Sequence, residues 1–326
     1  MRFFKYANWA LPAVRPPKPL RVVILTSIRD VGASDRNGEP HQLMDGHSHY
    51  MMGAVEAIAE ASRPGGVLGG LVEVALVITD DTEADERLLK LGGYPRVPTP
   101  GMPWICPLEL KLPQPPTTAH TAGDGALVAT ADVTRNIPSS FRSLRLSERV
   151  GRRVAKREHE LAVLAAFQQA DGDVLLSDHY MARLEHVIGD ECGIGIGRVL
   201  NIHPAITRKG DPDCLCGPTP TREAIELAQA RHCARGPPVR TGATLHLVTA
   251  KIDDGPAIAL AEGTPVYPGD SERELRHRNY RLAKLPALIG GLAHYATRIW
   301  PHVPLRGTGV TDLGLRAARW LNCEKL

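Results

Sequence analysis

The sequence has few cysteines, little net charge and no long hydrophobic run. Six cysteines in 326 residues are too sparse for a disulfide-stabilised scaffold, which favours a reduced, cytoplasmic protein. No run of about 18 apolar residues occurs, so no membrane-spanning helix is expected. Residues 1–20 lack a clean cleavage site and are interpreted as an extension, not a signal peptide. Lys and Arg number 39 against 36 Asp and Glu, so composition favours neither a nucleic-acid nor a membrane partner.

Glycine and proline are abundant instead, with 31 and 27 residues. This excess predicts long or numerous loops. Much of it falls in three stretches, near 27–45, 92–123 and 208–218, which we interpret as insertions. The middle stretch contains eight prolines between Tyr94 and Pro116 and shows no strand or helix periodicity. Such a long irregular segment is typical of a functional or solvent-exposed addition to a domain.

Apolar patterning predicts strands that alternate with helices. Short apolar runs typical of buried strands occupy residues 21–26, 71–79, 173–177, 198–201, 244–249 and 257–261. Helices are expected over 47–61, 141–169, 181–187, 219–230 and from 271 towards 300, the last interrupted at Pro286. This order of elements predicts an α/β fold.

Two polar motifs follow predicted strands. Asn201 and His203, in the run Asn-Ile-His-Pro, emerge together at a carboxyl edge of the sheet, where open α/β sheets build their sites. Asp253 begins an Asp-Asp-Gly-Pro turn between the next two predicted strands. An asparagine amide can stabilise an oxyanion, and a histidine titrates near neutral pH. The aspartate can hold that histidine cationic or relay a proton through a bound water. Taken singly, each residue also has an ordinary structural explanation, as a strand-end cap, a loop histidine or a turn aspartate.

In their order and with their flanks, these motifs resemble those of the folate-dependent formyltransferases, typified by glycinamide ribonucleotide transformylase. The family's catalytic Asn-x-His-Pro and its Asp-x-Gly-Pro turn match Asn201, His203 and Asp253. The resemblance covers residues 174–294 well and 21–79 more weakly. It implies an open, mostly parallel sheet flanked by helices, a Rossmann-like formyltransferase core with loop insertions. It also implies a single domain over 1–326, although about 150 residues per domain would suggest two.

The resemblance further implies an enzyme that transfers a formyl group from 10-formyltetrahydrofolate, its co-substrate, to a small-molecule amine or hydroxylamine. Asn201 and His203 would stabilise the tetrahedral intermediate, and Asp253 would assist proton transfer. The residues expected to bind the folate are Met181, Ala182, Arg183, Leu184, Thr249, Ala250, Lys251 and Ile252. Candidate clamps for an acceptor carboxylate are Arg29, Arg36 and Arg281. No metal ion, nucleic acid or membrane is expected as a partner.

Departures from the family pattern bear on the acceptor. The loop from Ser27 to Arg36 has no obvious phosphate nest, which disfavours a purine-pathway acceptor. About seventy residues follow Asp253 and read as strand and helix, which disfavours the extra β-barrel of methionyl-transfer-RNA formyltransferases. Residues 1–20 leave no room for the regulatory domain usual in formyltetrahydrofolate hydrolases. The absent phosphate loop and the insertions are similar to a formyltransferase core used in siderophore assembly, and this resemblance implies δ-N-hydroxyornithine as the acceptor. A glycinamide ribonucleotide or amino-sugar formyltransferase, a 10-formyltetrahydrofolate hydrolase and a non-catalytic binding protein stay open as alternatives.

Other motifs are weaker. The glycines of 193–197 precede a strand instead of opening a helix, which disfavours a dinucleotide loop. Cys214 and Cys216 have no second pair at the usual spacing, which disfavours a zinc site. His246 lies mid-strand, where a structural hydrogen bond is at least as common as a catalytic role. Arginines over 142–153 form a basic helix face, typical of a solvated surface or of contact with an anionic ligand.

Overall fold

The computed structural model describes residues 5–6, 16, 18–27, 54–82, 111–113, 127–129, 134–180, 183–189, 193–195 and 197–302. The chain divides into two compact units, one formed by 21–195 and the other by 1–20 together with 196–326. Each is considered by itself, and the single domain inferred above stays a prediction. The insertions predicted near 27–45 and 92–123 fall almost wholly outside the described residues, whereas 208–218 lies within them.

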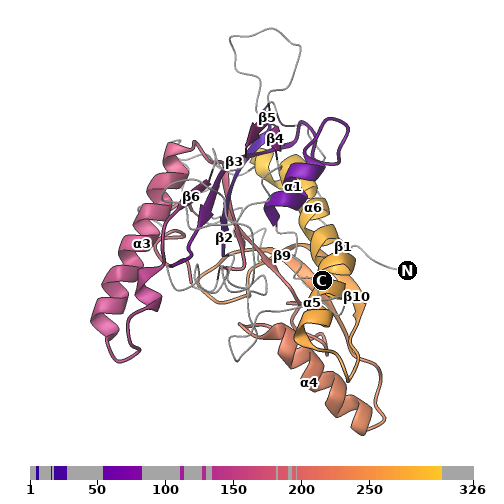
Figure 1. The fold of residues 1–326 in the computed structure, drawn as a ribbon. Helices are drawn as coiled ribbons and strands as arrows, with labels where there is room; N and C mark the ends of the chain where they lie inside the picture. Colours follow the sequence, from indigo (N-terminus) through magenta and orange to yellow (C-terminus); the bar gives the residue numbers. More distant parts are fainter. Residues whose placement is uncertain are drawn as a thin grey trace. The chain divides into compact units, whose positions relative to one another are not determined.

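The unit 21–195 contains a sheet with the strand order β7-β2-β3-β6. Figure 1 labels β2, β3 and β6 of this sheet. Its strands are β2 (Leu20–Thr26), β3 (Val72–Thr79), β6 (Thr134–Asn136) and β7 (Val174–Asp178). β2 pairs with β7 in parallel, and β3 pairs with β6 in parallel. Every residue of β7 and all but one of β2 are buried, as the continuous apolar runs predicted. A separate antiparallel pair joins β4 (Lys111–Pro113) to β5 (Leu127–Ala129).

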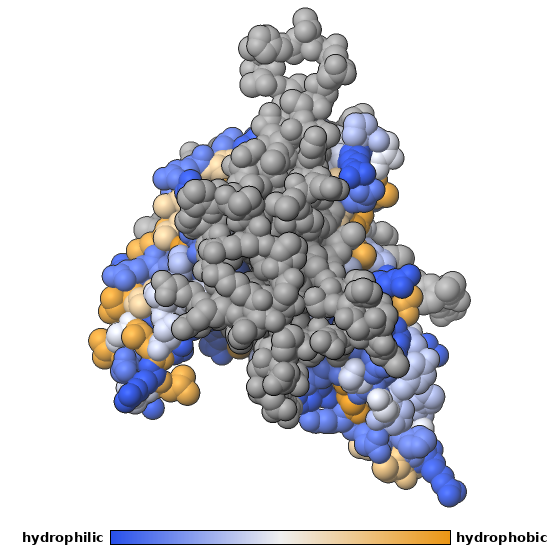
Figure 2. Space-filling model, in the orientation of Figure 1, coloured by the Kyte–Doolittle hydropathy of each residue, from blue (hydrophilic) through white to orange (hydrophobic). Residues whose placement is uncertain are grey.

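Helices accompany this sheet. α1 (Ala54–Ala61) packs against β3, and α3 (Arg149–Gln169) follows a short 3-10 turn, η2 (Ser140–Arg142). The exposed face of α3 mixes basic and apolar side chains, with Val150 and Val154 beside exposed arginines (Figure 2). No described helix is long and apolar enough to span a bilayer.

The prediction of a short helix over 181–187 is wrong for the residues described there. Residues 183–189 form a turn, closed by one hydrogen bond from the Ile188 N–H to the Leu184 carbonyl at 3.2 Å. The buried carboxylate of Glu160, on α3, accepts the backbone N–H groups of His186 and Val187. A buried carboxylate needs such donors, and this tertiary demand outweighs the local helical spacing.

The unit that contains 196–302 has the strand order β1-β10-β9-β8, and every neighbouring pair is antiparallel. Its strands are β1 (Lys5–Tyr6), β8 (Val199–His203), β9 (Arg240–Leu247) and β10 (Ala257–Pro265). α4 (Pro220–Cys233) begins at the predicted Thr219–Pro220 boundary and continues past the predicted end at Ala230. The α/β class is confirmed, with parallel pairing in one unit and antiparallel pairing in the other.

A long C-terminal helical run begins at Ser271, as predicted, through a capping box with Glu274. α5 (Glu272–Asn279) continues through a π-helical turn, η3 (Tyr280–Lys284), into α6 (Leu285–His294), which packs on β9 and β10. The interruption expected at Pro286 is a change of helical geometry and not a break. Proline lacks an N–H group and clashes with the carbonyl one turn earlier, and the wider π turn directly before it accommodates both.

Asn279, the last residue of α5, connects this helix to the ends of two strands. Its side chain is 4% exposed, and its amide nitrogen donates to the Pro204 carbonyl at 2.9 Å and the Gly242 carbonyl at 2.8 Å. Pro204 directly follows His203 on β8. The amide therefore anchors the strand end that carries this histidine.

Replacement of Asn279 by alanine should lower the free energy of unfolding by about 2–4 kcal/mol, because two buried carbonyls would lose their donor. Equilibrium denaturation measures this difference. The matched control is Leu282→Ala on the exposed side of the same helical run, which should change stability by no more than about 0.5 kcal/mol. Equal effects of the two substitutions would contradict the anchoring role of Asn279.

Candidate active site

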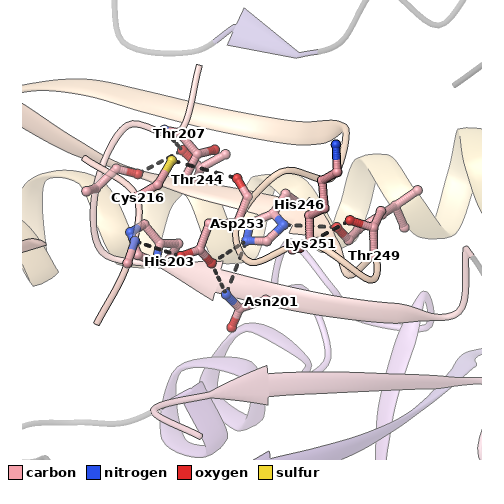
Figure 3. A network of polar contacts seen from close by, with 12 residues as sticks. Asn201, His203, Thr207, Cys216, Thr244, His246, Thr249, Lys251 and Asp253 are labelled. Carbon is pink, nitrogen blue, oxygen red and sulfur yellow. Dashed lines mark hydrogen bonds and ion pairs between the residues drawn. The ribbon is translucent and has the colours of Figure 1, made fainter. Parts of the chain in front are cut away.

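The predicted catalytic residues converge on one sheet face (Figure 3). Asn201 and His203 lie on β8, and Asn201 is the cross-strand partner of His246 on β9. Alternate residues of a strand share a face, and paired residues of antiparallel neighbours share it too. The strand register alone therefore groups the three side chains. The site lies entirely within the unit that contains 196–302.

Asp253 reaches this face from the turn between β9 and β10. It adopts a positive φ of 48°, a conformation that aspartate tolerates better than most residues. Gly255 lets the turn close tightly, because a Cβ atom there would lie 1.7 Å from the Leu247 carbonyl oxygen. The Leu247 N–H in turn donates to the Pro256 carbonyl at 3.0 Å. The turn thus folds back and carries the Asp253 carboxylate over the strands.

One carboxylate oxygen of Asp253 faces Asn201 and His246. The Asn201 amide nitrogen lies 3.1 Å from Nε2 of His246 and 3.4 Å from Oδ1 of Asp253. Nδ1 of His246 lies 2.9 Å from the Leu247 carbonyl, which can only accept a hydrogen bond. Nδ1 therefore carries the proton in neutral His246, and Nε2 accepts from the Asn201 amide. Both amide hydrogens of Asn201 are thereby directed at partners.

The other carboxylate oxygen faces His203 and the loop after β8. Oδ2 of Asp253 lies 3.5 Å from Nδ1 of His203 and accepts the Gly217 N–H at 3.0 Å. Nε2 of His203 lies 3.0 Å from the Leu215 carbonyl, so Nε2 carries a proton and donates it. Neutral His203 consequently presents the lone pair of Nδ1 towards Asp253.

Burial and neighbours set the charges of this pair. Burial by itself raises the pKa of Asp253. A hydrogen bond from His246 in its protonated form, the positive charge that His203 and His246 carry when protonated, and the Gly217 N–H together outweigh burial and hold the pKa below the usual aspartate value. Burial lowers the pKa of His203, and the nearby Asp253 and Leu215 carbonyl only partly oppose it. The site at neutral pH therefore combines an ionised carboxylate with a neutral imidazole, and the alternative of a cationic His203 is disfavoured in the free protein.

The other predicted site residues are distributed as follows. Thr249 to Ile252 lie in the turn just before Asp253, and residues 250–252 are exposed. Arg281 is exposed on η3 and makes no hydrogen bond or ion pair with the described residues of this site. Arg183 is exposed and Leu184 is buried, both in the unit 21–195. Met181, Ala182, Arg29 and Arg36 lie outside the described residues.

Sequence reasoning missed several groups of the site. The backbone groups of Leu215 and Gly217 have no sequence signal, because any residue carries a carbonyl and nearly any an N–H. His246 was noted, but its contact with Asn201 depends on the strand register. Lys284 is 4% exposed, and its charge helps to lower the pKa of His203. It stands one helical turn from Arg281, which the sequence suggested as a clamp for the acceptor carboxylate. Across the described residues, no group of three or more His, Cys, Asp or Glu is placed to hold a metal ion.

No protein-family model and no curated protein sequence matches the chain. Solved structures do match. PvdF of pyoverdin biosynthesis, described as a structurally unique N10-formyltetrahydrofolate-dependent formyltransferase, is 24% identical, and the match covers 85% of this chain and 98% of PvdF with a TM-score of 0.65. This chain has the formyltransferase fold.

Two further solved structures match this chain more weakly. Glycinamide ribonucleotide transformylase 1 from Symbiobacterium toebii is 18% identical, over 90% of this chain and 93% of the other, with a TM-score of 0.49. A formyltetrahydrofolate deformylase from Pseudomonas syringae pv. tomato is 16% identical, over 89% of this chain and 65% of the other, with a TM-score of 0.47.

The lowered pKa of His203 should make stability depend on pH. Below about pH 6.5, the unfolded chain takes up a proton that the folded imidazole resists, so the free energy of unfolding should fall as the pH falls from about 7 to about 5. His203→Gln keeps a donor for the Leu215 carbonyl but does not titrate. Chemical denaturation at a series of pH values should show a shallower decline for this variant. A decline as steep as that of the unmodified protein would contradict the burial of a neutral His203.

Proposed function

We propose that the chain is a 10-formyltetrahydrofolate-dependent formyltransferase that acts on the amino or hydroxylamino group of a small molecule. The observation that carries this proposal is the contact of Asn201, His203 and Asp253 on one face of a formyltransferase fold. Any one of these residues has a simple structural explanation. Their convergence from a strand and a separate turn does not follow from those explanations.

The reaction requires three things of the site. The acceptor nitrogen attacks the formyl carbon, so negative charge develops on the formyl oxygen. The attacking nitrogen must lose a proton, and the departing folate nitrogen must gain one. Positioned donors for the oxyanion and a base for the proton are the groups that lower such a barrier.

Asn201 is suited to the oxyanion. Its amide nitrogen donates to His246 at 3.1 Å, whereas the contact to Asp253 at 3.4 Å is longer than an ordinary N–H···O bond. The hydrogen directed at Asp253 is therefore held weakly and can be transferred to a developing oxyanion. His246, fixed by the Leu247 carbonyl, keeps the amide from rotating as this happens.

His203 and Asp253 are suited to the proton. The neutral imidazole has a free lone pair on Nδ1, and the carboxylate beside it stabilises the imidazolium that forms when a proton arrives. The proton taken up by Nδ1 can then return towards the departing nitrogen. The Gly217 N–H and the Leu215 carbonyl hold the two partners in place throughout.

The folate would lie against the turn that leads to Asp253. The backbone of 249–252 is available there, and Ile252, 50% exposed, offers an apolar side chain. Leu184, which the family resemblance includes among the folate-binding residues, is buried. Arg183, Met181 and Ala182 complete the proposed folate-binding set.

The proposed acceptor is δ-N-hydroxyornithine in siderophore biosynthesis. The sequence disfavours a phosphate-bearing acceptor at the loop 27–36, and the likeness to an enzyme of pyoverdin biosynthesis supports the same class. Arg29, Arg36 and Arg281 stay candidates for the acceptor carboxylate. Glycinamide ribonucleotide, an amino sugar and water, the acceptor of a hydrolase, are the alternatives to be tested.

Substitution of the three converging residues should remove activity without unfolding the protein. Asn201→Ala, His203→Ala and Asp253→Asn should each lower kcat about 10²- to 10⁴-fold, since each removes an oxyanion donor or part of the proton path. Release of tetrahydrofolate and circular dichroism measure rate and folding. Asp254→Asn is the matched control, because this neighbouring turn carboxylate pairs with Lys209 and Lys251, away from the imidazoles. Wild-type rates in all three variants would refute the catalytic assignment.

A second assay identifies the acceptor. The protein should release tetrahydrofolate from 10-formyltetrahydrofolate when δ-N-hydroxyornithine is present and form the N-formyl product, observed by mass spectrometry. Ornithine and glycinamide ribonucleotide should react at least about tenfold more slowly. Fast release with water alone and no formylated product would instead establish a hydrolase. Turnover with glycinamide ribonucleotide but not hydroxyornithine would overturn the proposed acceptor alone.

A further inference from the structure

The loop after β8 supplies both backbone groups that hold the His203–Asp253 pair. The Leu215 carbonyl accepts from Nε2 of His203, and the Gly217 N–H donates to Oδ2 of Asp253. Only Cys216 separates these two residues. Any change in the backbone of this short stretch therefore acts on both members of the pair.

Two cysteines flank Leu215. The sulfur atoms of Cys214 and Cys216 lie 3.8 Å apart. Sγ of Cys216 also lies 3.9 Å from the Asp253 carbonyl oxygen (Figure 3). Cys216 is exposed and Cys214 is partly exposed, and both are free thiols. Formation of a bond would require the two sulfurs to approach by about 2 Å, to the usual S–S length.

Backbone hydrogen bonds hold the base of this loop. The Leu215 N–H donates to the Ile206 carbonyl at 2.9 Å, and the Cys214 N–H donates to the Asp211 carbonyl at 3.1 Å. Gly217 adopts a φ of 119°, which L side chains rarely adopt. The peptide groups between Cys214 and Cys216 would become part of the ring that a disulfide closes, so the bond would constrain the Leu215 carbonyl directly.

We propose that Cys214 and Cys216 form a reversible disulfide on reaction with an oxidised small-molecule thiol, and that this bond withdraws the Leu215 carbonyl or the Gly217 N–H from the His203–Asp253 pair. The thiol pair is thus a modification site coupled to the candidate active site. Its effect on formyl transfer rests on the proposed function, whereas its effect on His203 does not.

The chemistry is an exchange in two steps. The thiolate of one cysteine attacks a sulfur of the small disulfide, forms a mixed disulfide and releases one small thiolate. The second cysteine loses its proton, attacks the protein sulfur of that mixed disulfide and releases the other small thiolate. Overall, two protein thiols and one small disulfide become one protein disulfide and two small thiols, so electrons and protons balance.

Acidity should govern the rate of this exchange. Burial, then the hydrogen bond and charge of Cys214 and the nearby aspartates, raise the pKa of the Cys216 thiol to about 11. Because the thiolate is the reactive form, oxidation should be slow at neutral pH and accelerate as the pH rises.

The experiment uses the full-length protein and oxidised glutathione at pH 7 and pH 9. After an acid quench and alkylation of free thiols, peptide mass spectrometry should find the segment with Cys214 and Cys216 without alkyl groups and two hydrogen atoms lighter than its unalkylated dithiol form. Treatment with dithiothreitol before alkylation should restore both alkylation sites. Cys233, exposed at the end of α4, provides the matched control: Cys233→Ser should behave as the unmodified protein, and Cys214→Ser should not form the internal bond.

Two readouts connect the bond to the site. The imidazole signals of His203 in NMR spectra, assigned by their loss in His203→Gln, should shift on oxidation and change their titration. The rate of formyl transfer should fall about tenfold or more, because small displacements of catalytic groups are costly. A shift of His203 with no formyl transfer in either state supports the disulfide and refutes the proposed function. A stable glutathione adduct without the internal bond, or an internal bond that leaves the His203 signals and the rate unchanged, overturns the inference.

Discussion

The carboxylate of Asp253 is held between two imidazoles, and the remainder of the site is arranged around that contact. One oxygen faces His246 and the Asn201 amide, and the other faces His203 and the Gly217 N–H. Burial alone would raise the pKa of this carboxyl. The hydrogen bond and charge of a protonated His246, the charge of a protonated His203 and the Gly217 N–H reverse that shift, so an ionised carboxylate lies beside a His203 imidazole whose own pKa is lowered by burial. A pair with these charges can accept a proton and hold it briefly, which is what acyl transfer to an amine requires.

The scaffold that holds this carboxylate is built from backbone constraints. Gly255 allows the turn after β9 to close against the Leu247 carbonyl, and Asp253 itself adopts a positive φ. Asn279 fixes the end of β8 from the helical run behind it. The loop 205–219 closes the other side through its peptide groups. Strands thus position Asn201, His203 and His246, while Asp253 and its loop contacts depend on two irregular segments.

Much of the fold follows from local pattern. The apolar runs predicted β2, β3, β7 and β8, and the Thr219–Pro220 and Ser271 signals predicted the starts of α4 and α5. The pattern failed over 181–187, because the buried Glu160 recruits backbone N–H groups that a helix would otherwise use. At Pro286 the pattern predicted an interruption of the helix but not that it would be a π-helical turn. Such errors arise where a distant charge or a neighbouring helical turn decides the local conformation, which residue spacing alone does not encode.

The sequence by itself determined the fold class and singled out three of the four side chains of the candidate site, because Asn201 and His203 on one strand and Asp253 after the next match a known motif order. Tertiary structure decided the rest. Cross-strand register placed His246 against Asn201, and burial made His203 neutral. The peptide groups of Leu215 and Gly217, and the proximity of Cys214 to Cys216, exist only once the loop is folded onto the strands. Backbone donors and burial are properties of packing, and any residue type can supply them.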